Sequence, residues 1–320
     1  MSHDALAAAN LIGLDWGSTS LRAFLIGPDG QVIATRDAAR GASVLHDGEQ
    51  YAGTLHEIAG DWLQARGDLP VLACGMVGSK HGWLEVPYAD CPGGAAELAT
   101  RLSQVPGQHV RIVPGMLCTA DNGVPDVMRG EETQIVGALH VHPDLAAQSC
   151  IILPGTHSKW AAVQDAQVRG FATHMTGELF AVLRQHSVLG RLMPQQASVQ
   201  DDAAFRQGIE AARADGTLSL NHQLFAVRTL GLTGKLAESS LADYLSGLLI
   251  GHELCAGLTW RASKGLDRAP LALIGEPSLC RRYAQALEQY GQRAHQLSNT
   301  APTGLWQLAR SAGLLNPAQS

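Results

Sequence analysis

The sequence lacks the features of a secreted, membrane-bound or nucleic-acid-binding protein. No stretch of its 320 residues stays apolar for the length of a bilayer, and no basic region followed by an apolar run precedes the first predicted strand. The net charge is −6 and there is no long basic run, whereas nucleic acids and membrane surfaces are bound by concentrated positive charge. We therefore expect a cytoplasmic protein that binds neither nucleic acid nor membranes.

Several short motifs are also absent or incomplete. The six cysteines show no C-x-x-C or Cys/His ligand spacing, which favours reduced, mostly buried thiols. There is no G-x-G-x-x-G, and Gly234-Lys235-Leu236 lacks both the Ser/Thr and the earlier Gly of a P-loop. His252-Glu253 begins like a zinc-protease helix, but the second His is missing. A nucleotide site in this chain would therefore use neither a P-loop nor a G-x-G-x-x-G turn.

The most informative feature present is a short apolar strand that leads into a Gly/Ser/Thr-rich turn, in Leu11–Ser20 (LIGLDWGSTS). Two further strands within Leu21–Arg36, joined by a Pro-Asp-Gly turn, complete a predicted meander. Backbone N–H groups and hydroxyls of such a turn can bind phosphate, and Asp15 beside it can hold hydrated Mg²⁺. Taken alone, the pattern also fits an ordinary hairpin.

The same pattern recurs in Cys150–Trp160 (CIILPGTHSKW), again followed by a turn and a strand. The separation of Gly17 from Gly155 is too long for a solenoid repeat and suits a duplicated domain half. A length of 320 residues with 46% hydrophobic content suits two cores. Two phosphate-binding hairpins that face one another across a cleft are the layout of the actin-like ATPase and sugar-kinase superfamily, which this chain resembles.

A long loop follows the predicted helix Glu49–Arg66 and the buried strand Val71–Met76. Residues 75–94 are punctuated by Gly and Pro and are dense in polar and aromatic side chains. Loops of this kind usually line a site, although a rigid surface loop is the alternative.

Two adjacent acids follow the short predicted strand Arg111–Pro114. The apolar spacing from Glu131 onward predicts a helix with Glu131 and Glu132 in its first turn, where the positive helix end favours a carboxylate. Simple capping would explain both acids. They stand just before the second hairpin, where the hexokinase-like fold that the chain resembles brings its catalytic acid into the cleft, and this implies a catalytic role. Asp126 is the competing candidate.

The remaining pattern is mainly helical. Helices are predicted over 173–192, with Thr176 as its cap, and over 201–220 and 236–258, the last notched by Gly247 and Gly251 for close packing. A strand at Leu271–Gly275 precedes a helix at Leu279–Tyr290. In this superfamily a strand, a Gly and a helix at this point of the chain form the adenosine-binding segment.

The resemblance narrows to one family through long motifs in a fixed order. The strings DWGSTSLRAF, GMVGSKHGW with EVPY, DVMRGEETQ, LPGTHSKW, TGELF with HSVLGR, and YLSGLLIG are similar to those of the 2-dehydro-3-deoxygalactonokinases and extend over nearly the whole chain. The resemblance implies an α/β fold of two ribonuclease H-like (actin-like ATPase, hexokinase-type) domains with an interdomain cleft. Residues 1–132 would carry the first hairpin and a sugar-acid loop, and residues 133–320 the second hairpin and the adenosine segment.

The resemblance also implies ATP-dependent phosphorylation of 2-dehydro-3-deoxy-D-galactonate on its 6-hydroxyl, in galactonate breakdown. The second hairpin opens with Leu153-Pro154 where the superfamily usually has an Asp, so Asp15 would carry the Mg²⁺. The residues expected to bind nucleotide phosphate are Asp15, Gly17, Ser18, Thr19, Ser20, Gly155, Thr156, His157, Ser158 and Lys159. Those expected at adenosine are Gly275, Glu276 and Ser278, and those at the sugar acid are Ser79, Lys80, Trp83 and Arg129, with His157 as a further candidate.

The base that accepts the proton of the attacking hydroxyl is expected to be Glu131 or Glu132. The nearest alternative function is a kinase for another sugar acid, such as 2-dehydro-3-deoxygluconate. A sugar-sensing regulator on the same fold would need a DNA-binding helix-turn-helix, for which the ten residues before Leu11 leave no room, and a filament-forming ATPase would carry large insertions. The expected partner is a small-molecule substrate, and a homodimer is an open alternative for the assembly.

Overall fold

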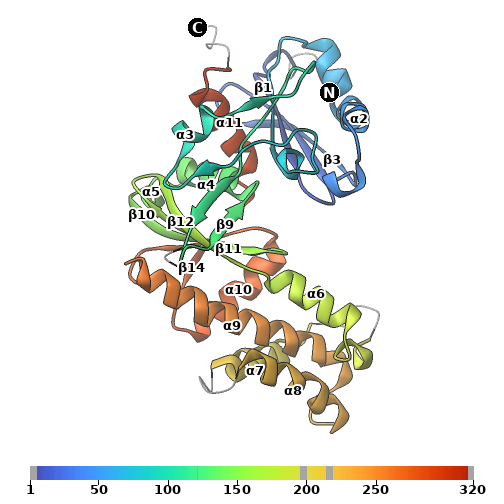
Figure 1. Ribbon diagram of the computed structural model, residues 1–320, viewed down its shortest axis with the longest axis vertical. Helices are drawn as coiled ribbons and strands as arrows, with labels where there is room; N and C mark the ends of the chain where they lie inside the picture. The colour runs from blue at the N-terminus through green and yellow to red at the C-terminus, as the bar shows by residue number, and fades with distance from the viewer. Residues whose placement is uncertain (1–5, 121, 195–199, 214–218, 316–320) are drawn as a thin grey trace. The chain divides into compact units, whose positions relative to one another are not determined.

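The computed structural model describes residues 6–120, 122–194, 200–213 and 219–315. It is a mixed α/β structure that divides into two compact units (Figure 1). The first unit contains Met1–Gln148, Val163–Phe171 and Asn299–Ser320, and the second contains Ser149–Ala162 and Ala172–Ser298. None of the helices in the described ranges combines the length and apolarity that crossing a membrane requires.

The predicted meander is confirmed at the start of the first unit. The strands β1 (Leu11–Trp16), β2 (Leu21–Ile26), β3 (Val32–Ala38), β4 (Val71–Gly75), β6 (Ser103–Gln104) and β7 (Val110–Ile112) form a sheet in the order β3-β2-β1-β4-β7-β6. Strand β1 pairs antiparallel with β2 and parallel with β4, and both β1 and β4 are buried over almost their whole length. A second, three-stranded sheet contains β5 (Ala89–Asp90), β8 (Met116–Thr119) and β9 (Pro125–Met128).

The helices described in the first unit are α2 (Gly48–Ala65), α3 (Ala95–Ala99), α4 (Glu131–Val141), α5 (Asp144–Ala147) and α11 (Ala301–Ser311), with short 3-10 turns at Ala42–Val44 and Met76–Gly78. Helix α2 confirms the predicted helix, and its N-cap is Asp47, whose side chain accepts a hydrogen bond from the N–H of Gln50. Helix α4 confirms the prediction that Glu131 and Glu132 stand in a first turn.

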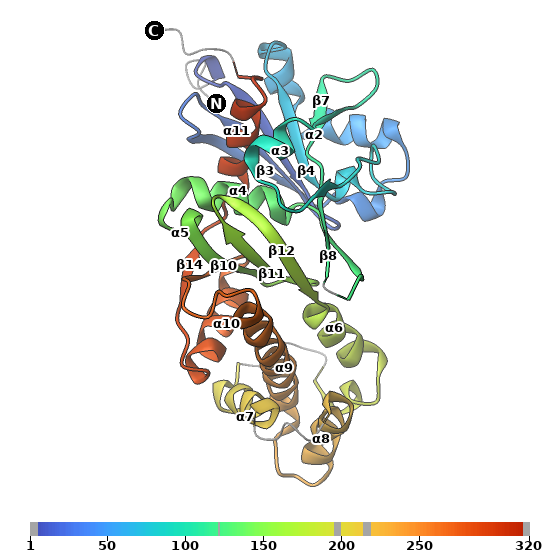
Figure 2. The same cartoon turned by 60° about the vertical axis from the view of Figure 1, so that its left-hand side comes forward.

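Helix α11 was not predicted, and it fixes the position of α4. A Cβ atom on Gly137 would lie 2.0 Å from the carbonyl oxygen of Thr300, and one on Gly304 would lie 1.9 Å from that of Thr133. The two helices therefore approach backbone to backbone, which only glycine permits. Helix α11 also packs on β1, where a Cβ atom on Gly13 would lie 3.0 Å from the side chain of Leu305. Figure 2 shows α11, in red, next to α4.

The second hairpin is confirmed as β10 (Gln148–Leu153) and β11 (Ser158–Gln164), followed by β12 (Gln167–His174). With β13 (Leu271–Ile274) and β14 (Ala294–Leu297) these strands form a sheet in the order β12-β11-β10-β13-β14. Strand β13 pairs parallel with both β10 and β14. The helices of the second unit are α6 (Thr176–His186), α7 (Asp202–Arg213), α8 (Leu220–Leu232), α9 (Leu241–Ser263) and α10 (Pro277–Gln289), with 3-10 turns at Gly190–Leu192 and Glu238–Ser240.

Helix α9 begins five residues later than predicted, and α8 before it was not predicted. The N–H groups of Lys235 and Leu236 both donate to the carbonyl of Leu230, and these bonds close the end of α8. The 3-10 turn Glu238–Ser240 then separates α8 from α9. The prediction that the glycines of α9 allow close packing is confirmed, since a Cβ on Gly247 would lie 2.0 Å from the carbonyl oxygen of Phe205 in α7. Residues 214–218 of the predicted helix 201–220 lie outside the described residues.

The predicted helix 173–192 is also shorter in the structure. Helix α6 starts at Thr176 and ends at His186. The prediction that Thr176 caps it is wrong, because Thr176 is the first helical residue and its hydroxyl donates to the carboxylate of Glu253 instead.

Candidate active site

Three chain segments meet at the carboxyl ends of the parallel strands in the first unit. Asp15 lies near the end of β1, and Gly75 ends the neighbouring strand β4, where it pairs with Trp16. A Cβ atom on Gly130, directly before α4, would lie 3.2 Å from the Cα atom of Gly75. In open α/β sheets ligands bind outside the carboxyl ends of the strands. The structure thus brings Asp15 and the acids of α4 to the edge where such a site is expected.

The turn at residues 17–20, called the first phosphate turn after its predicted role, is fixed by hydrogen bonds to its backbone while three of its residues are exposed. The carbonyl oxygens of Gly17 and Ser18 accept hydrogen bonds from the N–H groups of Ala42 and Ser43. The hydroxyl of Ser43 adds a further bond to Ser18 O at 2.6 Å. Ser18, Thr19 and Ser20 themselves are exposed. The turn is therefore pre-organised, with its hydroxyls available to a ligand.

Asp15 is paired with a residue that the sequence interpretation missed. Its Oδ2 atom lies 2.6 Å from Nη2 of Arg22, the residue opposite it in the β1–β2 register. The pKa of Asp15 is raised, because burial outweighs the opposing effect of Arg22, and the charge of Glu131 raises it further. Pairing the strands of the predicted hairpin residue by residue would have found Arg22.

The two acids at the start of α4 have different surroundings. The Oε2 atom of Glu131, which is partly buried, accepts from the N–H of Arg129 at 3.0 Å. Glu132 is 1% exposed, and its two oxygens accept from the N–H of Gly130 at 2.7 Å and from the hydroxyl of Thr133 at 2.9 Å. Burial, and to a lesser extent the charge of Glu131, raises the pKa of Glu132 to about 7.

The competing acid lies on a different element. Asp126 is in β9, opposite Cys118 of β8, and its carboxylate accepts from the N–H of Val127. It therefore belongs to the three-stranded sheet, whereas Glu131 and Glu132 belong to the helix that reaches the end of β4.

The loop of residues 75–94 gathers some of the residues predicted to bind the sugar acid. Nη2 of Arg129 donates to the carbonyl of Val86 at 2.8 Å, and its guanidinium lies 4.3 Å above the ring of Tyr88. Within the described residues its buried Nε and Nη1 atoms have no hydrogen-bond partner. Such orphaned donors are costly unless a ligand pairs with them.

The other residues predicted to bind the sugar acid differ in how deeply they are buried. Trp83 stacks on Tyr51, with ring centroids 5.7 Å apart, and meets Trp16 edge-on, so its indole is part of the core. Ser79 is partly buried and Lys80 is exposed.

In the second unit, the start of α6 packs on the turn at residues 155–158, called the second phosphate turn after its predicted role. A Cβ on Gly177 would lie 2.4 Å from Gly155 O, and the N–H of Glu178 donates to Thr156 O at 3.0 Å. The side chains of Glu178 and His157 are hydrogen-bonded to each other. Gly155, Thr156 and His157 thus form the accessible part of this turn.

Ser158 and Lys159, which were also predicted to bind phosphate, are buried. The hydroxyl of Ser158 donates to Glu253 at 2.7 Å, and Nζ of Lys159 donates to the carbonyl of His157 at 2.9 Å. Both side chains therefore stabilise the turn through hydrogen bonds on its buried side.

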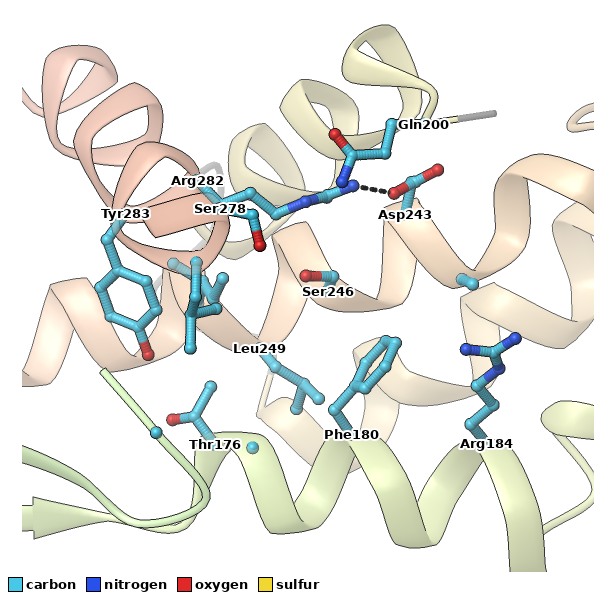
Figure 3. A pocket seen from close by; sticks show the side chains of 15 residues that line it. Thr176, Phe180, Arg184, Gln200, Asp243, Ser246, Leu249, Ser278, Arg282 and Tyr283 are labelled. Carbon is cyan, nitrogen blue, oxygen red and sulfur yellow. Dashed lines mark hydrogen bonds and ion pairs between the residues drawn. The ribbon is translucent and has the colours of Figure 1, made fainter. Parts of the chain in front are cut away.

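A cavity of about 340 Å³ in the second unit joins this turn to α6, α9 and α10 (Figure 3). Its wall includes Gly155, Thr176 and Gly177 from the turn and α6, together with Ser278, Arg282 and Tyr283 from α10. Arg282 forms an ion pair with Asp243 at the wall, and Arg184 of α6 lies at the end of the cavity away from Tyr283.

Of the three residues predicted at adenosine, Ser278 lines this cavity in the described part of the chain. Glu276 serves as the N-cap of α10, since its carboxylate accepts from the N–H groups of Ser278 and Leu279. Gly275 follows β13, and a Cβ on it would lie 3.2 Å from the carbonyl oxygen of Pro154. The strand, the Gly and the helix thus stand beside the second hairpin.

Comparison with known proteins gives the same family as the motifs. A model of the 2-keto-3-deoxy-galactonokinase family matches residues 15–308. A 2-dehydro-3-deoxygalactonokinase of Escherichia coli (strain K12) is 37% identical over 283 residues, which are 88% of this chain and 91% of that protein. A Rhizobium meliloti (strain 1021) protein assigned as the 2-dehydro-3-deoxygalactonokinase DgoK1 is 36% identical over 308 residues, or 93% and 96% of the two chains.

A solved structure agrees with this comparison. The crystal structure of a Sinorhizobium meliloti protein assigned as a 2-dehydro-3-deoxygalactonokinase matches with a TM-score of 0.82 and 34% identity, over 94% of this chain and 98% of that one. These matches define the class of the protein as a kinase, that is, a phosphotransferase. The chain belongs to the 2-keto-3-deoxy-galactonokinase family, and the resemblance predicted from its motifs is confirmed.

Proposed function

We propose that the protein transfers the γ-phosphoryl group of ATP to the 6-hydroxyl of 2-dehydro-3-deoxy-D-galactonate. The observation that carries the proposal is the family match from residue 15 to residue 308, which includes both phosphate turns and the acid-bearing start of α4. The cysteines of the protein are free thiols, as expected in a reducing compartment, and this supports a role in the cytoplasm.

We assign the two hairpins to two ribonuclease H-like domains of the actin-like ATPase type, with residues 1–132 and 133–320 as their expected extents. The support is local. In each sheet a buried strand, β1 or β10, leads into a phosphate turn and pairs with a parallel neighbour. The cleft between the domains stays a prediction from the family resemblance.

The nucleotide would be bound by the two turns and the cavity of the second unit. The exposed hydroxyls of Ser18, Thr19 and Ser20 and the accessible turn Gly155–His157 can donate to phosphate oxygens. The cavity beside Gly155 has the size and mixed lining suited to a nucleoside, with Ser278 in its wall. Gly275 and Glu276 would shape this segment by packing and capping.

Mg²⁺ fits the residues at the end of β1. Asp15 supplies a carboxylate, the ligand type that Mg²⁺ prefers, and within the described residues only its Oδ2 atom is engaged, by Arg22. When bound with ATP, the ion would neutralise charge on the phosphate oxygens.

The catalytic base in this proposal is Glu131. In phosphoryl transfer the protein forms few covalent bonds itself. Its residues align the attacking hydroxyl of the substrate with the γ-phosphate and accept the proton of that hydroxyl. Glu131 is partly buried and so is the more accessible acid at the start of α4, whereas Glu132 is 1% exposed. Glu132 would then position Gly130 and the helix start.

The carboxylate of the sugar acid would pair with Arg129. Its positive charge and its two orphaned donor atoms, Nε and Nη1, favour a carboxylate oxygen as the partner. Ser79 and Lys80 would add a donor and a charge, while Trp83 would shape the pocket from the core.

A coupled assay of ADP release tests the proposal. The purified full chain with ATP and MgCl₂ should turn over 2-dehydro-3-deoxy-D-galactonate with a higher kcat/KM than its gluconate epimer or D-galactonate. A higher kcat/KM for the gluconate epimer would assign the protein to that substrate instead.

A further inference from the structure

One buried carboxylate in the second unit has no role in the function proposed so far. Glu253, in the middle of α9, is 3% exposed and accepts four hydrogen bonds from side chains. Burying a carboxylate costs free energy unless hydrogen-bond donors surround it. The same hydrogen bonds hold the donor side chains in place.

The four donors come from the elements that form the nucleotide site. Oε1 accepts from the hydroxyl of Ser158 at 2.7 Å and from Nε1 of Trp160 at 2.9 Å, both on β11 directly after the second phosphate turn. Oε2 accepts from the hydroxyls of Thr176 and Tyr283, which line the cavity from α6 and α10. Figure 3 shows these two side chains together at one end of the cavity.

We propose that Glu253 is a positioning residue that sets the nucleotide affinity of this protein by holding the second phosphate turn, the start of α6 and α10 in one arrangement. The inference rests on the proposed function, because it takes the cavity to be the nucleoside site. Glu253 does not line the cavity itself, so it acts through Thr176 and Tyr283 on one side and through β11 on the other.

The chemistry of the donors predicts what Glu253→Gln would do. An indole N–H can only donate, whereas hydroxyls can donate or accept. The amide oxygen of Gln would therefore face Trp160 and Ser158, and its NH₂ group would face Thr176 and Tyr283. The bonds to β11 would be retained, while those to the cavity wall would be reversed in direction and lengthened.

The test compares Glu253→Gln with Arg261→Lys in the full-length protein. Arg261 is also buried in α9, but its guanidinium bonds to Gln292 and to the carbonyl of Ala269, which do not line the cavity. The dissociation constant of ADP is measured by calorimetry, and kcat and both KM values by the coupled assay.

We expect Glu253→Gln to raise the ADP dissociation constant and the KM for ATP about 10-fold, the size of one lost hydrogen bond to a charged group. The KM for the sugar acid should stay near the wild-type value, and Arg261→Lys should leave all three constants unchanged. Unaltered ADP binding by folded Glu253→Gln would overturn the inference, as would an equal loss in Arg261→Lys.

Tyr283→Phe provides a second variant if Glu253→Gln does not fold. It removes one donor and leaves three, so we expect a smaller rise in the ADP dissociation constant, and wild-type affinity would contradict the proposal. Wild-type protein is measured alongside. Failure of wild-type protein to bind ADP would refute the nucleotide site itself, whereas normal wild-type binding with unaltered variants would refute only the role of Glu253.

Discussion

The backbone of Gly130 lies so near that of Gly75 that a Cβ atom added to Gly130 would be 3.2 Å from the Cα atom of Gly75. Both glycines have positive φ angles, +108° and +92°. This contact joins the start of α4 to the end of β4, next to the strand that carries Asp15. The position of Glu131 and Glu132 relative to Asp15 therefore depends on a close approach at which a Cβ atom would be crowded.

Gly130→Ala should be markedly destabilising. The new Cβ would meet the backbone of Gly75 in a conformation that L-residues rarely adopt, so we expect a loss of about 3 kcal/mol in the free energy of unfolding. Gly107→Ala is the matched control, since Gly107 also has a positive φ but open space around its Cβ position. It should lose about 1–2 kcal/mol. Equal losses in urea denaturation would show that the contact with Gly75 is unimportant.

Asp15→Asn should abolish kinase activity and leave the fold intact. The substitution removes the charge proposed to organise Mg²⁺, so we expect kcat to fall at least about 100-fold. The partner Arg22 is 40% exposed and can be solvated by water once unpaired, so the melting temperature should change little. Asp61→Asn, which breaks the surface ion pair with Arg36, is the control and should retain activity. Near-wild-type turnover of Asp15→Asn would remove Asp15 from the site.

Glu131→Gln and Glu132→Gln should differ in the chemical step. If Glu131 is the base, Glu131→Gln should lower kcat by about 10²–10⁴-fold with ADP affinity retained. Glu132→Gln should cause a smaller loss, because it affects only the helix start. Kinetics at saturating ATP together with ADP titrations distinguish the two. Should both variants stay active while Asp126→Asn does not, the base is Asp126.

Glu132 should also make stability depend on pH. Its pKa is near 4.5 when unfolded and about 7 when folded, so the folded protein holds this proton more tightly. The contribution is fully present below about pH 4.5 and is lost as the pH rises through about 7. The free energy of unfolding of wild-type protein should therefore fall more between pH 5 and pH 8 than that of Glu132→Gln. The same pH dependence in both proteins would contradict the raised pKa.

The elements that could be predicted from the sequence are those with local signals. The meander around Asp15, helix α2 and the first turn of α4 follow from apolar periodicity, turn residues and a cap. The turns after β1 and β10 follow from the same signals, while their role in binding phosphate and the role of Arg129, predicted from its charge, stay predictions. Helix α11 was missed although Pro302 in its first turn is a local start signal, and only its glycine contact with α4 depends on the tertiary structure.

The contacts within the site depend on the tertiary structure. Ser158 and Glu253 lie 95 residues apart, and the incomplete zinc motif around Glu253 gave no hint of their hydrogen bond. The contact between Arg22 and Asp15 could be predicted in part, because the strand register places the two residues opposite each other once the hairpin is assumed.

The central claim is that the 6-hydroxyl of 2-dehydro-3-deoxy-D-galactonate receives the phosphoryl group, and phosphorus NMR of the product tests it most directly. The full chain is incubated with ATP, MgCl₂ and the sugar acid, and the coupling between phosphorus and the sugar protons is recorded. We predict one phosphate monoester whose phosphorus couples to the two protons on C6. A product phosphorylated at another oxygen, or no ester in the presence of folded protein, would contradict the account.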